Sequence, residues 1–271
     1  MPTQRIDAFG SVGLNTDLSP ATLPPAAWTR CEHVVTRDGK AVRAWDTTPL
    51  FYFAIEPKYR FAFHDSNGTQ YIAISDSRNV WVYNVATGQG ENITPAVPSL
   101  EFGLHCNFCS LNGVLCYNTT AESGGIFYWP GPGQVLKKMP DPTVPADGWR
   151  YDLKWRCTYL ASYRYYLVAI GMIEDGKAYP HKLRWSAAAE EGAVPSEWAP
   201  KASNDAGDDI LGDSSGALLG AVAVQDALWL VKADALYALN WVGGQYVLQS
   251  RRLQGVFDFA GIESVAEYAG R

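Results

Sequence analysis

The sequence predicts an all-β fold, and three observations lead to this prediction. Of the 271 residues, 13% are aromatic, including 10 Trp and 15 Tyr, and such side chains favour pleated sheets. The 25 Gly and 16 Pro supply turns and interrupt long helices. No stretch combines a sustained apolar stripe with caps at both ends, which a stable surface helix needs.

Residues 1–50 are expected to form an extended arm and a hairpin. The segment 14–28 contains three prolines, which disfavour helix and hold the backbone extended. Strands are then predicted at 31–36 and 41–45, because Asp38-Gly39 between them supplies the positive φ angles of a tight hairpin turn.

Residues 51–271 are expected to form one domain of repeated small antiparallel sheets. Asn112-Gly113 between two apolar runs is the clearest hairpin signal. Groups of three or four short strands recur about every 40–50 residues, which fits the blades of a β-propeller better than a sandwich, although a sandwich stays the alternative. The predicted strands are 60–64, 70–75, 79–84, 106–111, 114–118, 126–129, 156–162, 165–172, 182–186, 218–224, 227–232, 235–241 and 246–252.

Three segments leave a second interpretation open. Residues 187–192 allow one short helical turn, and the alanines of 217–224 allow a helix in place of a strand. Residues 263–268 are interpreted as the edge strand of a new unit, which leaves an unpaired edge. Either the chain is cut short relative to its natural product or this strand pairs with another unit, and we expect the former.

Charge and cysteine content narrow the functional classes. The formal net charge is −6 and no basic run occurs, which argues against the usual nucleic-acid binder, because affinity for phosphates comes from clustered Lys and Arg. Five cysteines, an odd number, indicate reduced thiols and assembly in a reducing compartment. The sequence has no apolar signal core and no run of membrane-spanning length. We therefore expect a soluble protein that is made in a cytoplasm and is not inserted into a membrane.

Two clusters resemble metal ligands, and neither is interpreted as a site. His105, Cys106, Cys109 and Cys116 include a Cys-x-x-Cys spacing, but Cys106 and Cys109 fall in a predicted strand and should face opposite sides. We interpret these cysteines as buried core thiols. The second cluster crowds a Gly-rich segment that we interpret as a solvated loop, since the closing Glu of a calcium loop is missing; it contains Asp205, Asp208, Asp209 and Asp213.

No catalytic constellation is recognisable. Ser214 and Ser215 lack the Gly-x-Ser-x-Gly elbow and a nearby His, and Glu190-Glu191 is interpreted as an exposed pair. A Gly-rich phosphate loop is also missing. We therefore predict a protein that is not an enzyme, with no catalytic, cofactor-binding or metal-binding residue. The four histidines, none in a recognisable catalytic setting, are His33, His64, His105 and His181.

Six segments, taken together in their order along the chain, resemble the tail nozzle or tail-stabilisation proteins of short-tailed bacteriophages, also called tail tubular or hub proteins. The arm and its hairpin resemble that family's extended arm and Arg-Asp-Gly hairpin, and a later Arg-Trp-Ser … Trp stretch resembles its propeller-like part. The segments are Gly13–Leu18, Leu23–Trp28, Val34–Gly39, Lys182–Ser186, Pro195–Trp198 and Gly212–Val231.

The resemblance implies a non-enzymatic component of the virion tail, assembled in the host cytoplasm. It implies a homohexameric ring below the portal and head–tail adaptor protein. This ring contacts tail fibre or tail tip proteins, and it conducts and retains viral DNA during ejection. The arm would dock on a neighbouring subunit or on the adaptor through Leu23, Pro24, Pro25 and Trp28, with Trp28 as anchor; alternatively, Trp28 fills the core of its own domain.

A second hypothesis is a carbohydrate-binding or carbohydrate-cleaving propeller that acts on host-surface glycans. Paired carboxylates across a cleft would be needed for cleavage. Binding would need exposed aromatic side chains that stack on sugar faces, for which the candidates are Trp129, Trp149, Trp185 and Trp198.

Overall fold

The computed structural model describes residues 13–14, 22, 27–28, 34–37, 40–43, 52–95, 105–121, 124–244, 247–262 and 265. The chain divides into two compact units, residues 1–52 and 53–271. Within the described ranges, the helical structure consists of the short 3-10 turn Pro145–Asp147 and a 3-10 residue at Ile262. No helix in this part of the chain has the length and apolar character of a membrane span.

The described residues of the first unit form two small strand pairs. Strands β1 (Gly13–Leu14) and β2 (Ala27–Trp28) pair in parallel. Strands β3 (Val34–Arg37) and β4 (Lys40–Arg43) form the predicted antiparallel hairpin, with Arg37 opposite Lys40. The turn residues Asp38-Gly39 and the proposed interface residues Leu23, Pro24 and Pro25 lie outside the described residues, and only the backbone of Trp28 is described.

The described part of the second unit forms four antiparallel sheets of four strands each, and in each of these sheets the spatial order of the strands follows the sequence. The first two sheets are β5 (Tyr59–His64), β6 (Gln70–Ser75), β7 (Val80–Asn84), β8 (Gly90–Asn92), and β9 (Cys106–Leu111), β10 (Val114–Thr119), β11 (Gly125–Tyr128), β12 (Lys137–Lys138). The other two are β13 (Arg156–Tyr163), β14 (Tyr166–Glu174), β15 (Lys177–Trp185), β16 (Gly207–Ile210), and β17 (Leu218–Val224), β18 (Ala227–Lys232), β19 (Leu236–Trp241), β20 (Leu248–Arg252).

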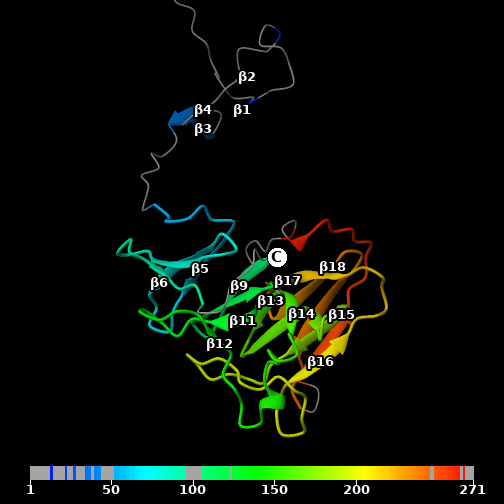
Figure 1. The fold of residues 1–271 in the computed structure, drawn as a ribbon. Coiled ribbons are helices and arrows are strands. Elements are labelled where there is room, and N and C mark those ends of the chain that lie inside the picture. The colour runs from blue at the N-terminus through cyan, green and yellow to red at the C-terminus, as the bar shows by residue number, and fades with distance from the viewer. Residues whose placement is uncertain are drawn as a thin grey trace, which may run out of the picture. The chain divides into compact units, whose positions relative to one another are not determined.

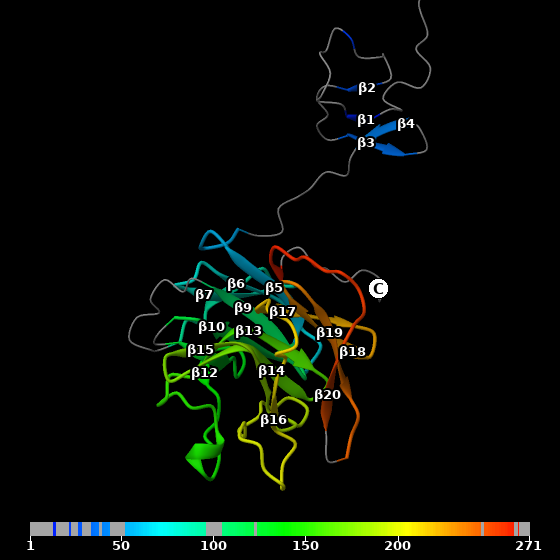
Figure 2. The same ribbon diagram turned by 90° about the vertical axis from the view of Figure 1, so that its right-hand side faces the viewer.

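The first strands of consecutive sheets lie next to one another. Strand β9 packs beside both β5 and β13, and β13 packs beside β17. Figure 1 and Figure 2 show these four strands toward the middle of the unit, with the later strands of each sheet, such as β12 and β16, farther out. Radial repetition of four-stranded sheets is the arrangement of propeller blades. The predicted all-β, propeller-like fold is therefore confirmed.

Each pair of consecutive sheets shares its own hydrophobic core. Because side chains alternate between the two faces of a strand, Phe108 packs toward the first sheet while Cys109 packs toward the third. In the third sheet, Leu160 faces the second sheet and Ala161 faces the fourth. Three separate clusters result, one between each pair of sheets.

The sequence predicted most inner strands and missed three outer ones, β8, β12 and β16. Two of the missed strands begin with a glycine that lies under an aromatic ring of the preceding strand. Gly90 is opposite Tyr83 and Gly207 is opposite Trp185, and a Cβ atom on either glycine would collide with the ring. Short, glycine-first strands carry no alternating apolar pattern, so periodicity does not detect them.

The open alternatives are settled for two segments. Residues 218–224 form strand β17, and residues 187–192 contain no helix. The Asn112-Gly113 turn is confirmed, with φ angles of 51° and 82°, the left-handed pair of a type I′ hairpin. Of the predicted strand 263–268, only Val265 lies within the described residues.

Candidate functional site

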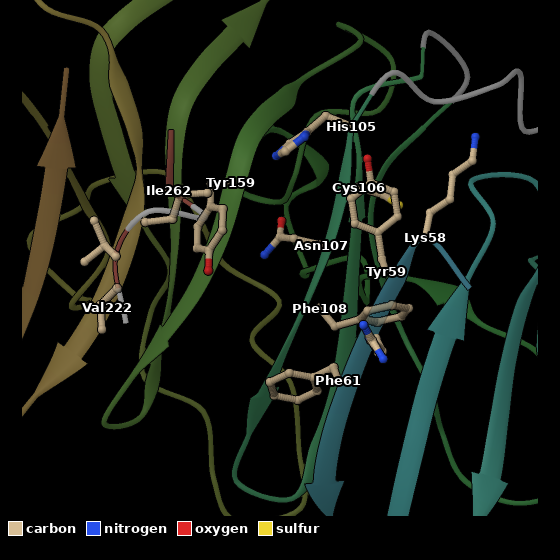
Figure 3. A pocket seen from close by; sticks show the side chains of 12 residues that line it. Lys58, Tyr59, Phe61, His105, Cys106, Asn107, Phe108, Tyr159, Val222 and Ile262 are labelled. Atoms are coloured by element: carbon tan, nitrogen blue, oxygen red, sulfur yellow. The ribbon is translucent and has the colours of Figure 1, made fainter. Parts of the chain in front are cut away.

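The candidate site is a cavity of about 390 Å³ at the centre of the four sheets. Residues from all four first strands line it, together with the segment that follows β20. Figure 3 shows Val222, Ile262 and Tyr159 on one side, and Tyr59, Phe61 and Phe108 on the other. The remaining lining residues are Lys58, Arg60, His105, Cys106, Asn107 and Val265.

The cavity lies along the inner edge of strand β5. Side chains from both faces of a strand can border a cavity at its edge, which explains why the consecutive residues 58–61 all contribute. Tyr59 and Phe61 lie on the face that packs against the second sheet. The ring of Tyr59 meets the ring of His105 edge-on, with centroids 6.1 Å apart, so these two side chains hold the start of β5 against the start of β9.

Asn107 closes the inner edge of strand β13. Its Nδ2 donates to the carbonyl oxygen of Leu160 at 2.7 Å, and its Oδ1 accepts from the Leu160 N–H at 3.1 Å. The side-chain amide thus takes the place that the peptide group of a neighbouring strand would occupy. Asn118 adds a bond from Nδ2 to the same Oδ1, at 3.1 Å, and another to the carbonyl of Cys157, at 3.2 Å. We call Asn107 and Asn118 the asparagine clamp.

Cys106 is the only thiol that lines the cavity, within the described residues, and it is not activated. Burial raises its pKa to about 11, and the thiol lies 3.9 Å from the Ser75 hydroxyl. A nucleophilic cysteine needs a lowered pKa and a nearby cationic or basic partner. The cavity therefore offers packing and polar recognition, and no activated thiol nucleophile.

The cysteine interpretation is confirmed for the four described thiols, which are all free and buried. Cys106 lies in the core of the first and second sheets, and Cys109 lies with Cys116 and Cys157 in the core of the second and third. The described residues contain no group of three or more potential ligands arranged for a metal ion. Cys31 lies outside them.

The aspartate segment is partly a strand, which corrects the prediction of a solvated loop. Asp208 and Asp209 belong to β16, where Asp209 accepts a 2.6 Å hydrogen bond from the hydroxyl of Ser250 in the last sheet. Asp213 accepts from the hydroxyl of Tyr237, and this bond lowers the pKa of Asp213 against the opposing effect of burial. Each of these carboxylates thus bonds to a different protein partner.

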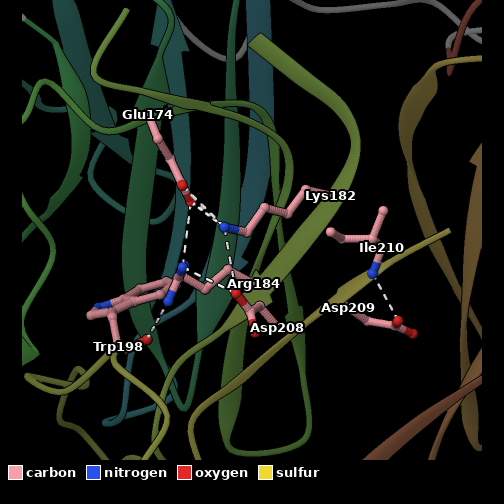
Figure 4. A network of polar contacts seen from close by, with 7 residues as sticks. All are labelled: Glu174, Lys182, Arg184, Trp198, Asp208, Asp209 and Ile210. Carbon is pink, nitrogen blue, oxygen red and sulfur yellow. Dashed lines mark hydrogen bonds and ion pairs between the residues drawn. The ribbon is translucent and has the colours of Figure 1, made fainter. Parts of the chain in front are cut away.

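Asp208 belongs to a partly buried network of two carboxylates and two cations in the third sheet (Figure 4). Lys182 lies 2.8 Å from Glu174 and 3.4 Å from Asp208. The Arg184 guanidinium lies 3.4 Å from Glu174 and 3.2 Å from Asp208, and it donates to the Trp198 carbonyl at 3.2 Å. The charges balance within the network, as buried charges require, so its role is to tie β14, β15 and β16 together.

The four tryptophans of the glycan hypothesis are buried, so they are not the exposed sugar-stacking platforms that this hypothesis requires. Their exposed fractions are 4% for Trp129, 4% for Trp149, 8% for Trp185 and 0% for Trp198. Trp149 packs edge-on against Trp198 with centroids 4.8 Å apart, inside the core of the second and third sheets. The expectation that these rings are exposed is wrong, because all four pack in the hydrophobic cores between consecutive sheets.

The serine segment holds no catalytic pair either. The Ser215 hydroxyl donates to Asp234 at 3.3 Å, and the Ser214 carbonyl accepts from Lys232 at 2.9 Å. Lys232 is fully buried and also donates to the Leu211 carbonyl, at 2.7 Å, so it fastens this loop to strand β18. Burial lowers the pKa of Lys232.

No protein-family model and no curated protein matches this chain. Among solved structures, the chain is similar to the β-propeller domain of Cps50 (Swd1) from Myceliophteria thermophila, with 11% identity, a TM-score of 0.43 and 80% of this chain covered. This chain spans 62% of the length of that one.

Two further solved structures are similar. One is the PQQ-bound aldose sugar dehydrogenase from Streptomyces coelicolor, with 10% identity, a TM-score of 0.30 and coverage of 73% of this chain and 84% of that one. The other is the mitotic checkpoint complex, with 9% identity, a TM-score of 0.29 and coverage of 81% and 90%. At such values the similarities carry no argument about activity, ligands or partners.

Proposed function

We propose that this protein is a structural component of a bacteriophage tail, a nozzle or hub ring below the portal and adaptor that conducts and retains DNA. The observation that carries the proposal is the ordered resemblance of the arm, the Arg-Asp-Gly hairpin and the Lys182–Ser186 and Pro195–Trp198 segments to that family. The proposal includes a homohexamer, contacts with the adaptor and with tail fibre or tip proteins, and no catalytic activity.

The resembling segments of the second unit are structural in this chain, which supports a scaffold role. Arg184 and Trp185 lie on β15, where Arg184 belongs to the charge network and Trp185 packs in the core of the third and fourth sheets. Trp198 is fully buried in the neighbouring core. These side chains hold neighbouring sheets together, so the resembling segments contribute to the scaffold of the unit itself.

The negative net charge of the chain supports the proposal that DNA passes through the ring without strong binding to its wall. The net charge of −6 disfavours the release of counterions that drives binding to phosphates. A ring whose subunits have this balance would present a weakly adhesive conduit to DNA.

The arm is the proposed attachment to a neighbouring copy or to the adaptor, through Leu23, Pro24, Pro25 and Trp28. The prolines reduce the conformational entropy that an extended segment loses on docking. Tryptophan is among the residues that contribute most to interface free energies.

Particle mass tests the proposal. Light scattering with mass analysis is carried out on the full chain alone and with the head–tail adaptor of the same phage. A sixfold ring, alone or on the adaptor, is the expected result, and Trp28→Ala should shift the protein toward the monomer. Thr87→Ala, at an exposed turn, is the matched control and should leave the mass unchanged. A stable monomer that ignores the adaptor would refute the nozzle.

A further inference from the structure

Among the described residues, the charged side chains that line the central cavity are cationic. This part of the lining includes Lys58 and Arg60 and no described Asp or Glu, although the whole chain carries a net charge of −6. Lys58 and Arg60 are exposed, so they remain solvated cations beside an otherwise apolar wall.

Asp76 is close enough to act electrostatically on Cys106, but it is not among the residues that line the cavity. Its carboxylate accepts hydrogen bonds from the backbone N–H groups of Arg78, at 2.8 Å, and of Asn79, at 2.6 Å. Asp76 therefore stabilises the turn between β6 and β7.

The walls are apolar and partly aromatic. Tyr59, Phe61 and Phe108 face Val222 and Ile262 across the cavity, as Figure 3 shows. The volume of about 390 Å³ lies within the range of about 300–1,000 Å³ that is typical of small-molecule pockets. Flat rings on one wall and aliphatic side chains on the other accommodate a planar group.

We propose that the central cavity binds a small anion with a flat apolar body, such as an aromatic carboxylate or sulfonate. The planar group lies between the wall of Phe61 and Phe108 and the side chain of Val222. The anionic group lies toward Lys58 and Arg60. This inference goes beyond the proposed structural role and is independent of ring formation.

Two probes with the same ring system separate the role of the charge from the role of the apolar walls. The anion is 1-anilinonaphthalene-8-sulfonate, and the neutral analogue is N-phenyl-1-naphthylamine, which lacks the sulfonate. Both fluoresce more strongly in apolar surroundings, so titrations of the full chain give the stoichiometry and the Kd of each. The expected result is one site per chain, with the anion bound more tightly than its neutral analogue.

Three variants then assign the site. Val222→Trp fills the cavity and should abolish binding of both probes, with near-ultraviolet circular dichroism as the check on folding. The double change Lys58→Gln/Arg60→Gln affects exposed side chains, and it should weaken binding of the anion about tenfold, since exposed charge pairs each contribute a few-fold, and leave the neutral probe unchanged. Lys137→Gln/Lys138→Gln removes the same charge from exposed strand β12 and should change neither.

Two results would overturn the inference. The first is undiminished binding of the anion to a folded Val222→Trp variant, which would place the probe elsewhere. The second is an equal effect of Lys58→Gln/Arg60→Gln on both probes, or no effect on either, which would show that these cations do not recognise the anionic group.

Discussion

The asparagine clamp gives the sharpest stability prediction. In Asn107→Ala, the N–H and the carbonyl of Leu160 lose their partner, and the Asn118 amide loses one acceptor. Each intramolecular hydrogen bond contributes about 1 kcal/mol net, and a buried group left without a partner costs about 1–3 kcal/mol. Three bonds therefore predict a decrease of about 3 kcal/mol in the free energy of unfolding.

The assay is urea unfolding followed by tryptophan fluorescence, since Trp149 and Trp198 lie in the core of the second and third sheets. Asn67→Ala, at an exposed turn position, serves as the matched control and should change stability by less than about 0.5 kcal/mol. A double-mutant cycle of Asn107→Ala with Asn118→Ala should show a coupling of about 1 kcal/mol, because the two side chains share a bond.

The reasoning is refuted if Asn107→Ala is as stable as the Asn67→Ala control. That outcome would mean that water or a shifted backbone satisfies Leu160 at no cost. A coupling near zero with a large single effect would instead confine the contribution of Asn107 to strand β13.

The remaining predictions concern charge, packing and pH. Arg184→Met leaves the two partly buried carboxylates Glu174 and Asp208 with Lys182 as the one remaining cation of the network, and the uncompensated negative charge should lower the free energy of unfolding by about 3 kcal/mol. Loss of the exposed Arg150–Asp152 pair through Arg150→Ala should cost less than about 1 kcal/mol, and denaturant titration compares the two. Gly207→Ala places a methyl group against the buried ring of Trp185 and should cost about 1–3 kcal/mol, while Gly212→Ala, in open space, should leave Tm unchanged. Burial raises the pKa of Cys106 from 9.0 to about 11, so its contribution to stability is complete below pH 9 and is lost as pH rises toward 11; Tm measured across this range should fall less steeply in Cys106→Ala.

Several inner strands were predictable from local sequence. Strands β6, β9, β17 and β18 have the predicted bounds, because each is a short apolar run between turn residues. The turn Asn112-Gly113 was predictable for a separate reason, since its φ angles suit only a few residue types.

The outer strands and the roles of the tryptophans were not predictable in the same way. Strand β16 contains Gly207, Asp208 and Asp209, which favour loops, and it forms because Trp185 covers the glycine and Arg184 pairs with Asp208. These partners are brought together by tertiary structure. Aromatic content likewise indicates sheets without showing which rings are exposed, so Trp198 could be placed in a core only from the structure.

The residues that line the cavity could also not be predicted without knowledge of the topology. Tyr59, Asn107, Tyr159 and Val222 stand in different sheets, and they meet because each belongs to the first strand of its sheet. The usable signal in the sequence is positional: the first strand of each repeat is expected to border the centre of a propeller. The identity of the lining residues follows once those strands are aligned.

The separation of the core into three clusters has a thermodynamic consequence. Each cluster joins only two consecutive sheets, so the free energy of the unit resembles that of a one-dimensional chain of coupled elements, as in repeat proteins. The second and third sheets each belong to two clusters, whereas the first and fourth each belong to one. Local opening should therefore start at the terminal sheets, and the slowest amide exchange should occur in β10 and β14, where a neighbour covers both faces.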